Sequence, residues 1–87
     1  MKYTEKCSVG IFDAIVNNVM TAYESDKPYN VGDTAYIREY DDTRFHEIEA
    51  EGYTGKWCYC VVTHIYNARL DPNRKILSIK LLKRWDD

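Results

Sequence analysis

The sequence predicts a small α+β domain in which about five short strands form a mixed sheet that curls or closes into a barrel, with one short helix after the first strand. The chain has 87 residues, which is enough for one domain and not for two, so residues 1–87 are expected to fold as a single unit. Apolar and polar residues alternate along most of the chain, as they do in strands. Helical spacing of apolar residues occurs once, between residues 11 and 19.

The first third of the chain predicts a strand, a helix and a second strand. Residues 3–8 alternate as a strand does, and Ser8 stands where the N-cap of a helix is expected. The helical spacing follows in the apolar residues Ile11, Phe12, Ile15, Val16 and Val19. Asn17 and Asn18 are expected to end this helix, because Asn tolerates the left-handed conformation of a helix terminus. Residues 19–24 then predict the second strand.

Three further strands are predicted after a turn at residues 30–33, where Gly32 is expected to supply a positive φ. They cover residues 34–40, 57–66 and 75–85. The strand at 57–66 is apolar on both sides, so we expect the barrel interior to cover one face and the helix to cover the other. In the last strand we expect two faces, one with Leu77, Ile79 and Leu81 and the other with Ser78, Lys80 and Arg84.

The charge of the chain argues against a non-specific nucleic-acid binder, since such a protein needs many cations to neutralise phosphates. The formal net charge is −2. The charge is nevertheless unevenly placed, with five Lys or Arg against eleven Asp or Glu in residues 1–55, and seven against three in residues 56–87. A local basic strip on an acidic protein is therefore compatible with the sequence.

The chain shows neither the pattern of a signal peptide nor the run of about 20 apolar residues that a membrane span requires. It has three cysteines, which leaves one over from any pairing and suits a reducing compartment. We therefore expect a cytoplasmic protein with no membrane partner.

Four short motifs occur in a characteristic order along the chain. They are VGD at Val31 to Asp33, EYD at Glu39 to Asp41, YTG at Tyr53 to Gly55, and IY at Ile65 and Tyr66. In this order and spacing they resemble the small ASCH-related branch of the PUA-like superfamily, whose members are compact barrels common in bacterial and phage genomes. The resemblance implies a PUA-like mixed β-barrel and a ligand that is RNA or a nucleotide.

The chain departs from that family at the end of the helix. Family members usually carry Gly-Lys-Lys there, followed by a strand with Glu-x-Arg and an Asn-Asp-Arg turn. This chain has Asn17-Asn18-Val19 instead and lacks the Glu-x-Arg, so that only Asp26 and Lys27 resemble the turn. In related enzymes that remove acyl groups from nucleosides, such a lysine and a nearby acid carry the chemistry, and Asn or Val cannot replace them. We therefore expect a non-enzymatic binding module, with a degenerate nucleoside amidohydrolase as a less favoured alternative.

The resemblance places EYD and YTG at neighbouring strand ends, where they would form the rim of a ligand pocket. Tyrosine rings there would stack on a base, and the acids would accept hydrogen bonds from its amino groups. The predicted ligand-binding residues are Lys27, Glu39, Tyr40, Asp41, Tyr53, Thr54 and Lys56. The structural alternative is that YTG enters a turn and that Tyr40 is a core or edge ring.

The C-terminal third contains a candidate phosphate-binding strip made of Arg69, Arg74, Lys75, Lys80, Lys83 and Arg84. The alternative interpretation is the solvated face of an edge strand, where lysines discourage pairing between sheets. Trp85 is expected to close the barrel, although a Trp beside Lys83 and Arg84 is also a plausible stacking surface.

A third candidate surface is the segment between EYD and YTG, which is longer than the resemblance leads us to expect. Its candidate partner-binding residues are Arg44, Phe45, Glu47, Ile48, Glu49 and Glu51. An acidic, partly apolar loop of this kind could dock on a basic host protein surface. The alternative function is thus a phage-type accessory protein that inhibits a host protein in the host cytoplasm, such as a nucleic-acid-handling defence (CRISPR-like) complex. The alternative structure is a solvated loop, and the oligomeric state is left open.

Cys58, Cys60 and His64 would share one face of a strand, which suggests a metal site, but their spacing argues against it. A rise of ~3.3 Å per residue places His64 about 13 Å from Cys60, whereas zinc ligands lie ~2.0–2.3 Å from the metal. A Cys pair joined by Cys7 or His46 would lack the usual spacing of a metal motif. We therefore expect buried structural thiols, no metal and no cofactor.

Overall fold

The computed structural model describes residues 1–41, 52–67 and 71–87. Its described residues form one five-stranded sheet in the order β1-β3-β4-β5-β2, with a single short helix. β1 and β3 are parallel, and the other neighbours are antiparallel. The elements are β1 (Lys2–Ser8), α1 (Val9–Val16), β2 (Ala22–Ser25), β3 (Thr34–Tyr40), β4 (Tyr53–Asn67) and β5 (Lys75–Arg84).

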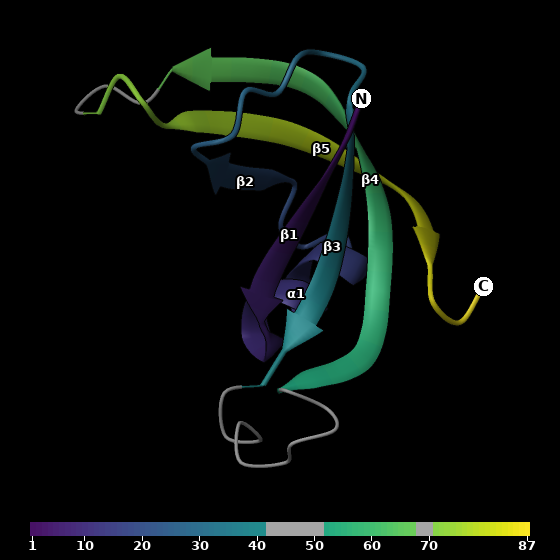
Figure 1. Ribbon diagram of the computed structural model, residues 1–87. Coiled ribbons are helices and arrows are strands. Elements are labelled where there is room, and N and C mark those ends of the chain that lie inside the picture. The colour runs from purple at the N-terminus through teal and green to yellow at the C-terminus, as the bar shows by residue number, and fades with distance from the viewer. Residues whose placement is uncertain (42–51, 68–70) are drawn as a thin grey trace.

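The sheet is curled, and β4 is the strand along which it bends (Figure 1). The first part of β4 pairs with β3, and most of its length pairs with β5. Register shifts lie between Tyr59 and Cys60 and between Val62 and His64, and such bulges bend a strand and increase its twist. The result is a half-barrel with α1 on its concave side (Figure 1), which confirms the predicted curled α+β sheet with a helix after the first strand.

Helix α1 begins and ends where the sequence predicts, although its N-cap differs from the expectation. Ser8 occupies the N-cap position in an extended conformation, but its side chain makes no capping hydrogen bond to the described residues. At the other end, Asn17 is the C-cap, its backbone N–H donates to Asp13 O at 3.1 Å, and Asn18 has a φ of 58°. Asn17 thus donates to a backbone carbonyl of the last turn, and Asn18 adopts the left-handed conformation that was predicted for the end of the helix.

The turn before β3 is also as predicted, because Gly32 has a φ of +94°. The Asp33 side chain stabilises this turn by accepting a hydrogen bond from Asn30 N at 2.8 Å. That hydrogen bond, together with the N-terminal ammonium 3.0 Å away, holds the pKa of Asp33 below its ordinary value. The turn therefore delivers the chain into β3 in register with β1, where Thr34 lies opposite Lys2.

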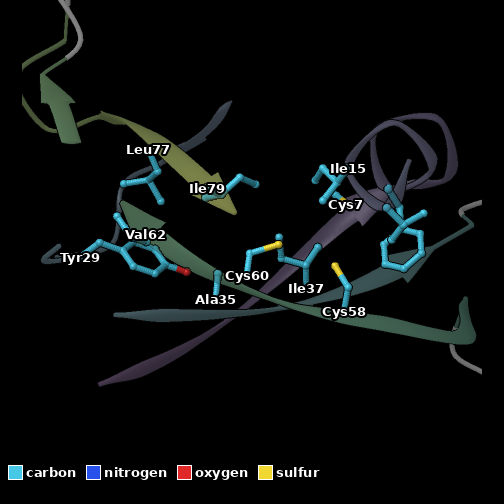
Figure 2. Close-up of a cluster of buried hydrophobic side chains, with 12 residues drawn as sticks. Cys7, Ile15, Tyr29, Ala35, Ile37, Cys58, Cys60, Val62, Leu77 and Ile79 are labelled. Carbon is cyan, nitrogen blue, oxygen red and sulfur yellow. The ribbon is translucent and has the colours of Figure 1, made fainter. Parts of the chain in front are cut away.

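The hydrophobic core lies between the concave side of the sheet and α1 (Figure 2). The three cysteine thiols are buried in it, and Cys58 and Cys60 are each 0% exposed, which confirms the prediction of buried structural thiols. The core side chains are Cys7, Phe12, Ile15, Val16, Tyr29, Ala35, Ile37, Cys58, Cys60, Val62, Leu77 and Ile79. Trp85 packs against this core through Phe12, with ring centroids 5.6 Å apart.

Two expectations about the strands are corrected. β4 is covered by the core on one face only, because Trp57, Tyr59 and Val61 lie on the opposite side and are half-buried. In place of a second layer, the Tyr36 ring on β3 packs against the rings of Trp57 and Tyr59 and covers part of their apolar surface. Arg84 does not share the outward side of Lys80. The register shift in β5 turns it inward, opposite Cys58, where it donates to Val16 O at 3.4 Å.

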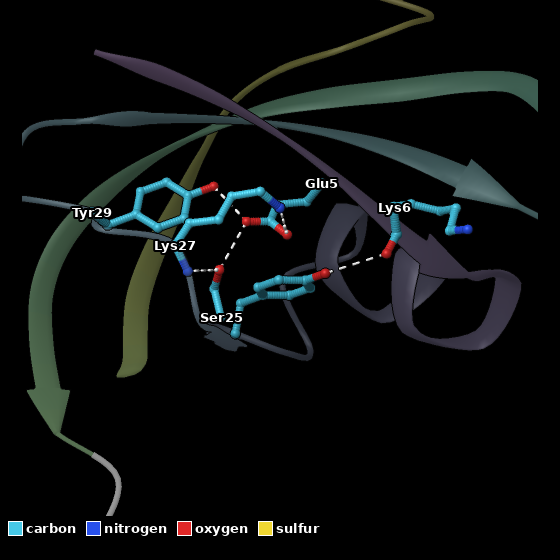
Figure 3. A network of polar contacts seen from close by, with 6 residues as sticks. Glu5, Lys6, Ser25, Lys27 and Tyr29 are labelled. Carbon is cyan, nitrogen blue, oxygen red and sulfur yellow. Dashed lines mark hydrogen bonds and ion pairs between the residues drawn. The ribbon is translucent and has the colours of Figure 1, made fainter. Parts of the chain in front are cut away.

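β1 and β2 are the two end strands of the sheet, and side chains join them across the open side of the half-barrel (Figure 3). Ser25 Oγ in β2 donates to Glu5 Oε2 in β1 at 3.0 Å. Tyr23 OH donates to Lys6 O at 3.4 Å. Within the described residues, no helix is both long enough and apolar enough to cross a membrane.

The protein is expected to lose stability between pH 9 and pH 12. Burial raises the pKa of the Cys7 thiol from its ordinary value of 9.0 to about 12, and burial together with Glu5 raises that of Tyr23 from 10.0 to about 12. The unfolded chain therefore releases these protons at lower pH than the folded one, so rising pH favours unfolding across this range. Urea midpoints measured at intervals from pH 8 to pH 12 should fall, and Tyr23→Phe should remove part of the fall. A flat profile would contradict the burial of both groups.

Candidate functional site

The surface of the sheet opposite the core, called the outer face below, brings side chains of β1, β3, β4 and β5 together. Residues paired across neighbouring strands project to the same side of a sheet. Thr4, Tyr36 and Tyr59 form one such row, and Lys6, Arg38 and Trp57 form the next. The outer face consists of Lys2, Thr4, Lys6, Thr34, Tyr36, Arg38, Tyr40, Tyr53, Trp57, Tyr59 and Val61, with Lys80 and Lys83 from β5.

Three rings form an aromatic cluster at the centre of the outer face. The ring centroid of Tyr36 lies 5.0 Å from that of Tyr59 and 6.0 Å from that of Trp57, and Trp57 lies 5.4 Å from Tyr59. All three rings are half-buried. The cluster therefore combines fixed rings with accessible ring surface, as a stacking platform for flat ligands requires.

Cations lie on the outer face at this aromatic cluster and beside it. Lys2 Nζ lies 5.5 Å from the Tyr59 ring centroid and 5.7 Å from that of Tyr36. The Arg38 guanidinium lies 3.7 Å from the Tyr53 ring centroid. On β5, Lys83 pairs with Tyr59 in the strand register. A planar or anionic ligand on this face would thus meet both rings and positive charges.

Acidic side chains of the same strands point away from the outer face. Glu5 and Glu39 are the only acidic residues in the sequences of β1, β3, β4 and β5. Glu5 is 7% exposed and Glu39 is 5% exposed, both on the core side. The outer face is therefore positively charged although the whole chain carries a net charge of −2.

The predicted neighbourhood of EYD and YTG exists at the end of β3. Tyr40 pairs with Tyr53 in the register, and their rings meet edge to face with centroids 5.3 Å apart. Thr54 Oγ1 donates to Glu39 Oε1 at 2.8 Å. Asp41 N donates to Gly52 O at 2.8 Å. Five of the predicted ligand-binding residues therefore lie together, with Glu39 on the core side and the two tyrosines on the outer face.

A pocket of about 430 Å³ lies beside these residues, where β1 ends and α1 begins. Residues 6–10 form one wall, and Tyr40 and Asp41 form the other. The Lys6 ammonium lies over the Tyr40 ring, 4.5 Å from its centroid. The pocket is therefore continuous with the outer face, because Lys6 and Tyr40 belong to both.

The other two predicted ligand-binding residues lie elsewhere. Lys27 Nζ pairs with Glu5 Oε1 at 3.0 Å in a buried polar cluster of Glu5, Ser25, Lys27 and Tyr29 (Figure 3). Tyr29 OH donates to Glu5 Oε2 at 2.8 Å, and burial and this hydrogen bond raise the pKa of Tyr29. Lys56 Nζ lies 5.1 Å from the Trp85 ring centroid. Neither Lys27 nor Lys56 is among the described residues that line the pocket.

The hydrogen bonds of the buried polar cluster connect separate segments of the chain, which is a structural role. The Glu5 carboxylate accepts hydrogen bonds from Ser25, Lys27 and Tyr29, and Ser25 Oγ also accepts one from Lys27 N at 3.1 Å. A buried carboxylate requires such partners, and these join β1 to the chain between β2 and β3. Elsewhere, the described residues hold no group of three or more His, Cys, Asp or Glu side chains suited to a metal ion.

The predicted basic strip is divided among three places. Arg74 forms an ion pair with Glu24, and Lys75 Nζ donates to Tyr29 O at 3.5 Å. Arg84 pairs with Asp86 at 3.1 Å. Lys80 and Lys83 lie on the outer face, whereas Arg69 is outside the described residues. The candidate partner-binding residues Arg44, Phe45, Glu47, Ile48, Glu49 and Glu51 also lie outside the described residues.

Sequence reasoning missed most of the outer face. It did not select Lys2, Lys6, Tyr36, Arg38, Trp57 or Tyr59 as site residues. A signal was present in residues 34–40, where Thr, Tyr, Arg and Tyr alternate with Ala, Ile and Glu. That alternation indicates a polar and aromatic face, but its neighbours on other strands depend on the register.

The sequence matches no protein-family model and has no significant match among the curated proteins.

Proposed function

We propose that this protein is a non-enzymatic module that binds single-stranded RNA across the outer face of its sheet. The observation that carries the proposal is the aromatic cluster of Tyr36, Trp57 and Tyr59 with Lys2 on its rings. Every nucleobase has a flat face that can stack on such rings, and cations beside them neutralise phosphates. RNA or a nucleotide is the ligand implied by the resemblance to the ASCH-related branch of the PUA-like superfamily.

The proposal assigns no catalytic step to the chain. In enzymes related to the family that the sequence resembles, a lysine after the helix and a nearby acid carry the chemistry, and here Asn18 and Val19 stand in that region. Glu5, the acid that lies near Lys27, is occupied by three hydrogen-bond donors. The three hydrogen bonds to Glu5 support a structural role for this carboxylate. The replacement of the lysine supports a protein that binds its ligand without transforming it.

The salt dependence of RNA binding tests this function. A variant with Lys2→Gln, Lys6→Gln and Arg38→Gln should bind a labelled single-stranded RNA more weakly at low salt. The slope of log K against log salt is negative, and each lost phosphate contact reduces its magnitude by about 0.7, so the loss of three contacts reduces it by about 2. Fluorescence anisotropy at several salt concentrations measures both values.

The control for this experiment is Arg74→Gln, which removes a cation that pairs with Glu24 outside the outer face. It should leave the slope unchanged. Undetectable binding of the unaltered protein at low salt, or an equal loss of slope in the control, would exclude the outer face as the RNA-binding surface.

A second candidate function rests on the acidic sequence at residues 43–51, which includes Glu47, Glu49 and Glu51 together with Phe45 and Ile48. Under this alternative the chain inhibits a host protein by docking on a basic surface. Reversing the charge of the three glutamates to lysine should abolish capture of a stoichiometric host protein from lysate. Under the RNA-binding function, the same variant should keep or increase its affinity for RNA, because it adds positive charge.

A further inference from the structure

The pocket between the end of β1 and the end of β3 has the size and position of a small ligand site. Its volume of about 430 Å³ lies within the range of about 300–1,000 Å³ that is common for such sites. Cys7 and Val9 contribute apolar surface, and Lys6, Tyr40 and Asp41 contribute polar groups. A mostly apolar cavity with a few polar groups at its rim suits a flat, partly polar molecule.

The Tyr40 ring is held in a fixed position at this pocket. Gly52 has a φ of +88°, and a Cβ atom built on it would lie only 2.5 Å from Tyr40 Cε2. The backbone at residue 52 therefore packs directly against the ring, and any larger residue there would displace it. Tyr53 contacts the same ring edge to face, with an interplanar angle of 81°. The ring is thus an ordered surface on which a base can stack at little entropic cost.

In the free protein, a cation covers the Tyr40 ring. Lys6 Nζ lies 4.5 Å from the ring centroid, on an exposed side chain with a flexible stem. A nucleobase can take the place of this ammonium on the ring. The displaced ammonium is then within reach of a phosphate attached to the same nucleoside, so that one ligand satisfies both groups.

We propose that this pocket binds one nucleoside monophosphate unit, with the base on Tyr40 and the phosphate on Lys6. The inference deepens the proposed function and rests on it in one respect: Lys6 and Tyr40 also belong to the outer face, so the unit is one nucleotide of the RNA strand that crosses that face. It adds a site that takes an unstacked base, separate from the aromatic cluster of Tyr36, Trp57 and Tyr59.

A titration with adenosine 5′-monophosphate, followed by amide NMR spectra, tests the pocket without any RNA. Saturable shifts are expected at residues 6–10 and at Tyr40, and inorganic phosphate alone should cause much smaller ones. Tyr40→Leu should weaken the affinity about tenfold, since it removes one base–ring stack. Tyr40→Phe keeps the ring and should stay within about twofold of the unaltered protein.

Tyr59→Leu separates this inference from the proposed function, because Tyr59 lies on the outer face and outside the pocket. It should weaken RNA binding and leave the affinity for the mononucleotide unchanged. RNA binding without saturable mononucleotide shifts at the pocket overturns the inference, as does an affinity that Tyr40→Leu leaves unchanged. Mononucleotide binding without RNA binding contradicts the proposed function but supports the nucleotide site in the pocket. The location of the shifts in the unaltered protein decides the matter even if a variant folds poorly.

Discussion

Replacing Glu5 with leucine should lower the free energy of unfolding by about 2–4 kcal/mol, because each buried donor left without its acceptor costs about 1–3 kcal/mol. The substitution leaves the Ser25 hydroxyl and the Tyr29 hydroxyl without their acceptor on the core side of β1. It also leaves Lys27 without its carboxylate. Because domains of this kind are stable by only about 5–15 kcal/mol, the loss would be a large part of the total. Urea denaturation followed by tryptophan fluorescence measures it.

Two comparisons show whether the effect belongs to the buried polar cluster. Glu5→Gln keeps the size of the side chain and one acceptor, so its loss of stability should lie between those of the unaltered protein and Glu5→Leu. Glu24→Leu removes the partner of Arg74 in an exposed ion pair and should cost at most about 1 kcal/mol. If Glu5→Leu cost no more than Glu24→Leu, the cluster would not be the element that joins β1 to the β2–β3 connection.

Replacing Tyr36 and Tyr59 together with leucine should weaken binding of single-stranded RNA about 100-fold. Stacking of a base on one aromatic side chain contributes about 1–3 kcal/mol, and 1.4 kcal/mol corresponds to a tenfold change in affinity. Leucine keeps apolar surface on the outer face but offers no flat ring. The measurement is fluorescence anisotropy with a labelled oligonucleotide at low salt.

Tyr66→Leu is the matched control for these rings. Tyr66 lies near the far end of β4, 53% exposed, and its ring contacts His64. Its replacement should leave the affinity for RNA unchanged. Ring pairs contribute about 0.5–1.5 kcal/mol beyond their buried area, so the double variant should lose a little stability and remain folded. A double variant that is less stable but binds RNA normally would make the aromatic cluster a purely structural feature of the sheet.

The strands and the helix were predictable because local signals determine them. Residues 34–40 alternate cleanly and form β3 with those bounds. Asn17 and Asn18 end α1, and Gly32 has the positive φ that its turn requires. The bounds of β4 were less accurate, since it begins at Tyr53 and includes the YTG motif. A strand that continues through a glycine with a φ of +93°, as at Gly55, is difficult to recognise from sequence.

The site was predictable only in part, because its residues are brought together by the pairing of distant strands and by which face of the sheet the core covers. The neighbourhood of Glu39, Tyr40, Tyr53 and Thr54 followed from a resemblance in motif order, and these residues do lie together. The outer face requires that Tyr36 lie opposite Tyr59, which no local pattern specifies. The apolar residues of β4 also appeared to need cover on both sides, whereas a single ring on β3, that of Tyr36, covers part of Trp57 and Tyr59.

The side-chain contacts between β1 and β2 have a mechanical consequence. Strands within the sheet are joined by regular backbone ladders, but these two end strands meet through the Tyr23 hydroxyl and the Ser25 hydroxyl. A few such bonds can break together without disturbing the ladders of β3, β4 and β5. Separation of β1 from β2 therefore breaks side-chain hydrogen bonds and leaves the backbone ladders of the sheet intact. The closure of the half-barrel thus depends on side chains, whereas its curved sheet depends on the backbone.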